Sequence, residues 1–231
     1  MKDDATKIAA GETVPTRRAS TVDEDLADAI IRMVIMRPLP PGAPLRENEL
    51  ALRFGVSRPT VRAALRKATT TGFVEITAFR GAHVRQLGVQ DLKDLLDMLE
   101  DIYGLAAREA ARRRSDEDVT NLHDFLERFD LGLGEASDGD KRIRLSFRFG
   151  SLVATAAHAP FIQDVLERTG QLVLWQQRLR FADVVWFERQ SLEFHRLLAW
   201  AVEHRNEIAA SDAARAIVRL TREALRESKI L

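Results

Sequence analysis

The sequence feature that most constrains the fold is the stretch ELALRFGVSRPTVRAALRKATTTGFVEI, residues 49–76. Wound as a helix after Ser57, a favourable N-cap residue, it gathers apolar side chains on one side and places a basic stripe along the neighbouring edge. The preceding ENELALRF predicts a second short amphipathic helix that ends at Gly55. Two helices joined by so tight a turn predict a helix-turn-helix. The basic stripe consists of Arg58, Arg62 and Arg66. The apolar side consists of Val61, Ala64, Leu65 and Ala68.

The residues after this motif predict a β-hairpin. GFVEITAFRGAHVRQL, residues 72–87, has the pattern of two short strands around a basic tip at Arg80 and Gly81. A hairpin behind a helix-turn-helix is the wing of a winged helix. We therefore predict a mainly α chain with three parts, namely a flexible tail over residues 1–20, a winged helix-turn-helix DNA-binding domain over residues 21–87 and an all-α helical bundle over residues 88–231.

Charge is distributed unevenly along the chain, although the formal net charge is zero. Residues 1–87 hold fourteen Lys and Arg against ten Asp and Glu, whereas residues 88–231 hold twenty-one against twenty-five. Residues 46–85 contain eight basic residues and three Glu, which favours contact with DNA phosphates over a merely solvated face. The longest basic side chains at the helix N-terminus can also form bidentate contacts to guanine. The predicted DNA-binding residues are Arg46, Ser57, Arg58, Thr60, Arg62, Arg66, Arg80 and Gly81.

Other classes of protein find little support in the composition. The chain has no cysteine and no GxSxG, GxGxxG or Walker motif, so we do not expect an enzyme. No run approaches the roughly 20 apolar residues needed to cross a bilayer, so we expect no membrane partner. The polar start MKDDATKIAAGETVPTRRAS lacks the apolar core of a secretory signal. We expect a cytoplasmic protein.

Residues 26–84 resemble the winged-helix domain of GntR-family bacterial transcription regulators. Most relatives read Thr-Pro where this chain has Pro59-Thr60, a swap that shifts one hydroxyl. The signature PG..L.E..LA..FGVSR..VR.AL is present, with Pro41, Gly42, Leu45, Glu47, Leu50 and Ala51 in place. The resemblance implies that base-reading and phosphate positions fall on Arg58 and Arg62, and that a wing tip at Arg80 and Gly81 enters the minor groove.

From residue 88 onward the apolar pattern keeps a helical period. Ser115 and Asp118 form a predicted capping box, Pro160 begins a further helix, and Asn206 can cap the last one. A helical bundle of this length behind a winged helix resembles the FCD-type ligand-binding domain of the FadR subfamily of GntR regulators. The apolar stripe of its first helix is Leu92, Leu95, Leu96, Leu99, Ile102 and Leu105.

FadR-subfamily bundles usually hold a divalent metal, bound by an Asp and a His four residues apart on one helix and by a His on each of two later helices. By resemblance, the Asp-x-x-Phe-His pattern falls on RLSFR, so that Arg144 stands for the Asp and Arg148 for the His. His195, in LEFH, is retained, and the last ligand falls at Ile217. Because a guanidinium has no lone pair to give a metal, we expect no metal and no other cofactor.

Arg144 and Arg148 are one helical turn apart, and two guanidinium groups in that arrangement can bind an organic anion directly. Ion pairs with Glu or Asp of a neighbouring helix are an equally open alternative. By resemblance, Leu99 and Tyr103 occupy positions where relatives often have Arg and Glu, so the predicted pocket is more apolar on that side. This favours a ligand with an acidic head and an apolar body. A lone buried His is more often a hydrogen-bonded core residue than a ligand contact. The predicted effector-binding residues are Leu99, Tyr103, Arg144, Arg148 and His195.

The aromatic residues of VLWQQRLRFADVVWF are interpreted as core or dimer interface, with pocket lining as the second choice. They are Trp175, Phe181, Trp186 and Phe187. A homodimer is expected because two helix-turn-helix units related by a two-fold axis reach successive major grooves, about 34 Å apart, on a palindromic site.

The predicted function is a sequence-specific transcription regulator, a repressor, that binds a palindromic operator in double-stranded DNA. A small organic acid in the helical domain would modulate this binding. The alternative is a DNA-binding regulator whose helical domain is only a dimerisation or protein-interaction scaffold. Melting in the presence of small acids distinguishes the two, because a ligand of the native state raises its stability.

Overall fold

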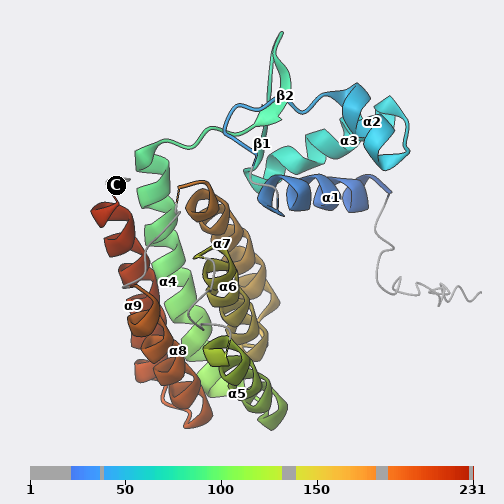
Figure 1. Cartoon of the computed structure of the whole chain (residues 1–231). Helices are drawn as coiled ribbons and strands as arrows, with labels where there is room; N and C mark the ends of the chain where they lie inside the picture. The colour runs from blue at the N-terminus through green and yellow to red at the C-terminus, as the bar shows by residue number, and fades with distance from the viewer. Residues whose placement is uncertain (1–21, 37–38, 132–138, 181–186, 229–230) are drawn as a thin grey trace, which may run out of the picture.

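A computed structural model describes residues 22–36, 39–131, 139–180, 187–228 and 231. The predicted tail over residues 1–20 lies outside the described residues, as do Phe181 and Trp186. Nine α-helices, one 3₁₀ turn and one two-stranded sheet make up the described chain, which confirms the mainly α prediction. Figure 1 shows a small N-terminal part at one end of a larger bundle of helices.

The N-terminal part is a winged helix. Its elements are α1 (Val22–Met36), α2 (Glu47–Phe54), α3 (Arg58–Ala68), a 3₁₀ turn (Thr69–Thr71), β1 (Val74–Thr77) and β2 (Gly81–Val84). The predicted turn between α2 and α3 is confirmed: Gly55 ends α2 with φ +66°, and the Ser57 hydroxyl accepts a hydrogen bond from the Thr60 N–H at 3.3 Å. β1 and β2 pair antiparallel, with Val74 opposite Val84.

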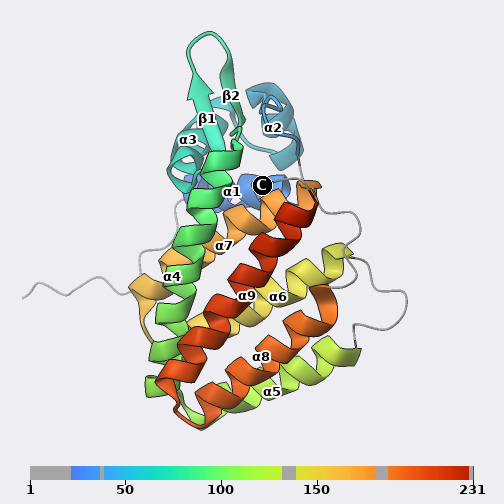
Figure 2. The same ribbon diagram turned by 90° about the vertical axis from the view of Figure 1, so that its left-hand side faces the viewer.

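Packing of α1 against α3 forms the core of the winged helix. The buried face of α1 includes Ile30 and Val34, and α3 contributes the predicted apolar side, which is buried at Val61, Ala64, Leu65 and Ala68. The same period that buries these residues turns the arginines of α3 outward. The hairpin of β1 and β2 projects away from the bundle (Figure 2).

The helical bundle consists of six helices. They are α4 (Val89–Arg113), α5 (Asp116–Leu131), α6 (Gly139–Ala156), α7 (Pro160–Arg180), α8 (Phe187–Glu203) and α9 (Glu207–Glu227). The Ser115 and Asp118 capping box is confirmed by reciprocal bonds of 2.8 and 3.1 Å, and Asn206 caps α9 by accepting from the Ala209 N–H at 3.0 Å. Pro160 begins α7, as predicted.

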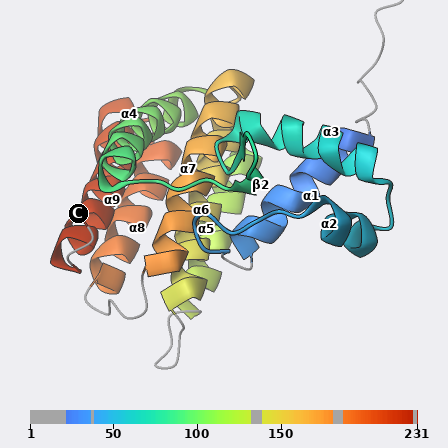
Figure 3. The same ribbon diagram turned by 90° about the horizontal axis from the view of Figure 1, so that it is seen from above.

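Helix α7 belongs to both parts of the molecule. Trp175 is fully buried, and its ring meets Phe73 of the winged helix edge to face, with 5.7 Å between ring centroids. Arg178 donates hydrogen bonds to the carbonyls of Ile35 and Met36 at the end of α1. Seen from above, the winged helix lies beside α7 (Figure 3). Trp175 is therefore core, as predicted, but this core joins the two parts of the chain.

Candidate nucleic-acid interface and bundle cavity

The N-terminus of α3 carries two arginines that share one carboxylate. Glu47 of α2 accepts hydrogen bonds from both the Nε and an Nη of Arg62 at 2.8 Å, and its carboxylate lies 3.8 Å from an Nη of Arg58. The side chains of Arg58 and Arg62 remain 60% and 51% exposed. Hydrogen bonding from Arg62 lowers the pKa of Glu47, so this carboxylate stays charged and holds the two guanidinium groups beside each other. The family signature includes Glu47, but the sequence alone does not predict this pairing.

The other predicted residues in and beside α2 and α3 are Arg46, Ser57, Thr60 and Arg66. The hydroxyls of Ser57 and Thr60 are 2.7 Å apart, so the Pro59-Thr60 order gives the N-cap serine a second hydroxyl partner. Arg66 is exposed two turns further along α3. Arg46 is also exposed, and it pairs with Glu49 at 3.0 Å. The surface thus combines exposed basic side chains with a capped helix N-terminus, the arrangement that contacts phosphates and base edges.

The wing tip presents an aromatic residue that sequence analysis missed. Phe79 has a fully exposed side chain and a positive φ of 64°, which is rare for a bulky residue. Gly81, with φ 74°, follows the exposed Arg80, and the Arg80 N–H closes the turn on the Thr77 carbonyl at 3.2 Å. An apolar residue between the strands, next to the predicted basic tip, was the available signal.

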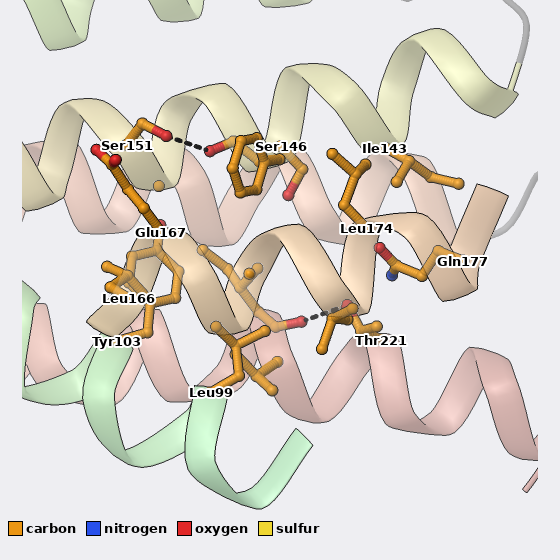
Figure 4. Close-up of a pocket in the computed structure, with 16 residues that line it drawn as sticks. Leu99, Tyr103, Ile143, Ser146, Ser151, Leu166, Glu167, Leu174, Gln177 and Thr221 are labelled. Carbon is orange, nitrogen blue, oxygen red and sulfur yellow. Dashed lines mark hydrogen bonds between the residues drawn. The ribbon is translucent and has the colours of Figure 1, made fainter. Parts of the chain in front are cut away.

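A second candidate site is a cavity of about 80 Å³ inside the bundle, between α4, α6, α7 and α9 (Figure 4). Its walls are mainly apolar, and the predicted Leu99 and Tyr103 both line it. The Ser151 and Thr221 hydroxyls bond to backbone carbonyls one turn earlier on their own helices, at 3.4 and 3.1 Å. Glu167 is the single charged residue among the described residues that line the cavity.

Tyr103 is the polar group of the cavity without a partner. Its side chain is buried, and its hydroxyl finds no hydrogen-bond partner among the described residues. Burial raises the pKa of this phenol, so the hydroxyl keeps its proton and can both donate and accept. The ring packs over Gly150, where a Cβ would lie 3.7 Å from the tyrosine oxygen. The Tyr103 ring therefore lies in van der Waals range of this position.

His195 lies beside the cavity, in the core. It is fully buried between Phe129 and Phe149, with ring centroids 5.3 and 5.0 Å away. Its Nδ1 is 2.5 Å from the Ser191 carbonyl, and because a carbonyl only accepts, Nδ1 carries the proton. Nε2 then accepts from the Ser146 hydroxyl at 3.0 Å. Burial lowers the pKa of His195 to about 4, which keeps the imidazole neutral.

Arg144 and Arg148 lie outside the cavity, contrary to the expectation that they face a ligand inside the bundle. Both are exposed, and neither is among the cavity-lining residues. Arg144 pairs with Asp140 of its own helix at 3.4 Å, and the same carboxylate accepts from Arg178 of α7. Arg144 thus has an ion pair, as the alternative expected, but with a residue of its own helix rather than of a neighbouring one.

Two family models match the chain in the order in which its two parts occur. The model "Bacterial regulatory proteins, gntR family" matches residues 23–84, which contain the helix-turn-helix and the wing. The model "FCD domain" matches residues 94–220, which contain most of the bundle. The chain belongs to the GntR family. Its members are transcription regulators that bind DNA through a helix-turn-helix.

Curated relatives of this GntR protein are transcription regulators. It is 33% identical to the Nta operon transcriptional regulator of Aminobacter aminovorans over 65% of this chain and 67% of that protein. It is 32% identical to a probable D-xylose utilization operon transcriptional repressor of Paenarthrobacter nicotinovorans, a match that spans 54% of this chain and about half, 53%, of the relative. No helix in the described part of this GntR protein is long and apolar enough to span a bilayer.

Solved structures with the same fold include E. coli McbR/YncC, with a TM-score of 0.77 at 17% identity. That match covers 91% of this chain and all of the other. A GntR regulator from Rhodococcus sp. RHA1, described as putative, has a TM-score of 0.63 at 18% identity and covers 89% of this chain and 94% of that one. At these identities the likeness concerns the fold.

The structure also corrects the alignment of the family's metal motif. Ser146 and Gly150 line the cavity, Ser146 touches His195, and Ile217 lines the same cavity. These positions match the Asp-x-x-Phe-His pattern as SFRFG, two residues later than RLSFR, which places Ser146 and Gly150 at the Asp and His positions. Two residues turn an α-helix by about 200°, so the earlier register selected the opposite face of α6.

The corrected set of residues does not fit a divalent metal. One hydroxyl, one imidazole, a glycine and an isoleucine give too few donors, and the imidazole already has a hydrogen-bond partner on each nitrogen. Across the described residues, no three His, Cys, Asp or Glu side chains gather closely enough to hold an ion. Tyr103 takes the space above Gly150 in which an imidazole would extend.

Proposed function

We propose that the protein is a homodimeric repressor whose winged helices bind a palindromic operator and whose affinity for it is modulated by a small molecule in the bundle cavity. The names of two relatives support repression rather than activation. One is a probable transcriptional repressor, and another is the transcriptional repressor RspR of E. coli. We place this activity in the cytoplasm, where operator DNA lies.

Recognition of the operator is assigned to the N-terminus of α3 and to the wing. Arg58 and Arg62 extend from the helix end that enters a major groove in helix-turn-helix proteins, and their pairing with Glu47 orients them before DNA arrives. Phe79 and Arg80 at the wing tip suit the minor groove, where an apolar side chain inserts between base steps and a cation lies over the phosphates. Two such units on a two-fold axis match two half-sites.

The observation that carries the regulatory half of the proposal is the double role of α7. Its residues Val173, Leu174 and Gln177 line the cavity. Its residues Leu172 and Trp175, on the adjoining face, belong to the apolar core of the winged helix. A ligand that shifts α7 therefore changes packing beneath α1 and β1 directly, because densely packed interiors transmit small displacements.

The test of DNA recognition begins with the DNA recovered with the purified protein, which is sequenced to define the operator. The double variant Arg58→Ala, Arg62→Ala should then lose operator affinity by about 1 to 3 kcal/mol for each base-reading arginine. Arg226→Ala, which removes an exposed arginine near the end of α9, is the matched control and should bind normally. Unchanged affinity in the double variant refutes the assignment.

The effector is proposed to bind without a metal. Purified protein should contain no stoichiometric zinc, nickel or manganese, as measured by elemental analysis, because the residues at the ligand positions supply too few donors. One tightly held divalent ion per chain would contradict this. The scaffold alternative predicts instead that no small molecule of any class alters the melting temperature or the operator affinity.

A further inference from the structure

The chemistry of the cavity departs from the acidic effector that the sequence favours. We infer that the cavity binds a small aliphatic amine in its protonated form, an inference that rests on the proposed function only in taking the cavity as the effector site. Three properties of the cavity carry it: its charge, its unpartnered hydroxyl and its size.

Charge is the first property. Among the described residues that line the cavity there is no Lys, Arg or His, and Glu167 is the one charged side chain. Arg144 and Arg148, the two arginines that were predicted to bind an acid, are exposed and are not among the residues that line the cavity. A carboxylate ligand would therefore meet a carboxylate and no compensating cation, whereas an ammonium group would form a charge-assisted hydrogen bond with Glu167.

The surroundings of Glu167 also suit a cationic head group. Its side chain is partly exposed, and Gln163 one turn earlier donates a hydrogen bond to it at 2.9 Å. This carboxylate stays near water, so an ammonium beside it keeps part of its hydration and avoids the full cost of burying a charge. Gln163 occupies one carboxylate oxygen in that bond and leaves the other for a ligand.

The remaining polar and apolar groups complete the site. The Tyr103 hydroxyl is buried without a partner among the described residues and can accept a second hydrogen bond from the head group. Leu99, Leu166 and Val173 line the cavity with aliphatic side chains that favour an alkyl tail. A volume of about 80 Å³ is several times the roughly 10 to 15 Å³ that one ordered water needs, so the cavity has room for a ligand of several heavy atoms.

The experiment uses three probes with one alkyl chain and different head groups: butylamine, butanol and butyrate. Each is titrated into the full-length protein at neutral pH and constant ionic strength, and binding is followed by calorimetry and by melting temperature. Butylamine should bind, butanol should bind more weakly, and butyrate should not bind. Tighter binding of butyrate than of butylamine, or no binding of any probe at millimolar concentration, overturns the inference.

Two variants and a matched control locate the binding. Glu167→Gln should weaken butylamine about tenfold or more while leaving butanol nearly unchanged, because only the ammonium loses a charged partner. Asp164→Asn removes an exposed carboxylate from the same helix outside the cavity lining, and it should change neither. Equal effects of the two substitutions would overturn the role of Glu167.

Filling the cavity provides a test that does not depend on charge. Leu99→Trp places a larger side chain at a half-buried wall position, and it should abolish binding of both butylamine and butanol without lowering the melting temperature. Undiminished binding in this variant would place the ligand elsewhere and overturn the inference. Operator affinity is measured on the same samples, so that butylamine binding without any change in operator affinity supports the ligand class and refutes only the proposed regulation.

Discussion

The two candidate sites of this protein differ in how they hold charge. On the winged helix, Arg58 and Arg62 are more than half exposed and share Glu47 as a counterion in water. In the bundle cavity, the lining among the described residues is mostly aliphatic, and its one charged group is an acid. The winged-helix surface presents long, basic and exposed side chains, whereas the cavity presents a mainly apolar wall with few polar groups.

This difference predicts that the two candidate sites bind their proposed ligands through different forces. Exposed arginines gain affinity for a polyanion by releasing its counterions, an effect that salt opposes. A mainly apolar cavity gains affinity by taking alkyl surface out of water, an effect on which salt has little influence. Helix α7 links the two, because it lines the cavity and also contributes Trp175 to the core of the winged helix.

The largest expected effect concerns salt. If a dimer neutralises six or more phosphates, raising salt from 50 to 200 mM should weaken operator binding by about a thousandfold or more. Butanol binding to the cavity should stay nearly constant over the same range, because the ligand is uncharged. Fluorescence anisotropy with labelled operator and calorimetry with butanol give the two slopes. An equal salt dependence of operator affinity and butanol affinity would contradict the proposed difference between the two sites.

The link between the two sites is tested at Trp175. Trp175→Ala should destabilise the protein by about 3 to 5 kcal/mol in urea unfolding, since it leaves a large void between α7 and Phe73. Trp175→Phe should restore most of the stability. Trp200→Ala, at a tryptophan that is 45% exposed on α8, is the control and should cost far less. Similar losses of stability in Trp175→Ala and Trp200→Ala would show that packing at the junction stabilises the protein no more than an exposed tryptophan does.

The bundle should be the acid-sensitive region, because of His195. Its pKa is about 4 in the folded protein against an ordinary value of 6.5. Between these two pH values the unfolded chain binds a proton at this histidine and the native state does not. Stability is therefore full above pH 6.5, falls as the pH drops and has lost about 3 kcal/mol by pH 4. The neighbours of the ring are hydroxyls, a carbonyl and phenyl groups, which do not titrate in this window.

Urea unfolding between pH 7 and pH 4 measures this dependence. His195→Gln should flatten it, whatever its effect on stability at pH 7. His204→Gln, at a half-exposed histidine near the end of α8, should leave the slope unchanged. A slope that survives His195→Gln would contradict the assignment.

The smallest expected effect lies at the start of α3. Ser57→Ala removes the side-chain acceptor for the Thr60 N–H and should cost about 1 kcal/mol of stability. Ser57→Asp should keep the cap but place a negative charge where phosphates approach, and should therefore weaken operator binding more than stability. Circular dichroism melts and operator titrations on the two variants separate capping from DNA contact. Equal operator affinity in both variants would argue that Ser57 acts only as a cap.

The winged helix was largely predictable because its signals are local. The cap at Ser57, the turn at Gly55 and the outward arginines of α3 depend on neighbours within a few residues, and each was found where the periodicity placed it. The pairing of Arg62 with Glu47 spans only fifteen positions, yet it depends on how two helices cross. The exposed Phe79 was equally hidden, because the pattern of two strands does not show which turn residue faces water.

The cavity was predictable only in part, since the inward face of α6 depends on what packs against it. RLSFR and SFRFG both carry Phe at the fourth position, so the sequence alone did not distinguish two registers that lie about 200° apart on the helix. Packing settled the register: Ser146 meets His195, forty-nine positions away, and Gly150 receives the ring of Tyr103. Local spacing determined the family and the DNA-binding face, whereas contacts between distant helices decided which side chains the cavity contains, because burial is a property of the assembled fold.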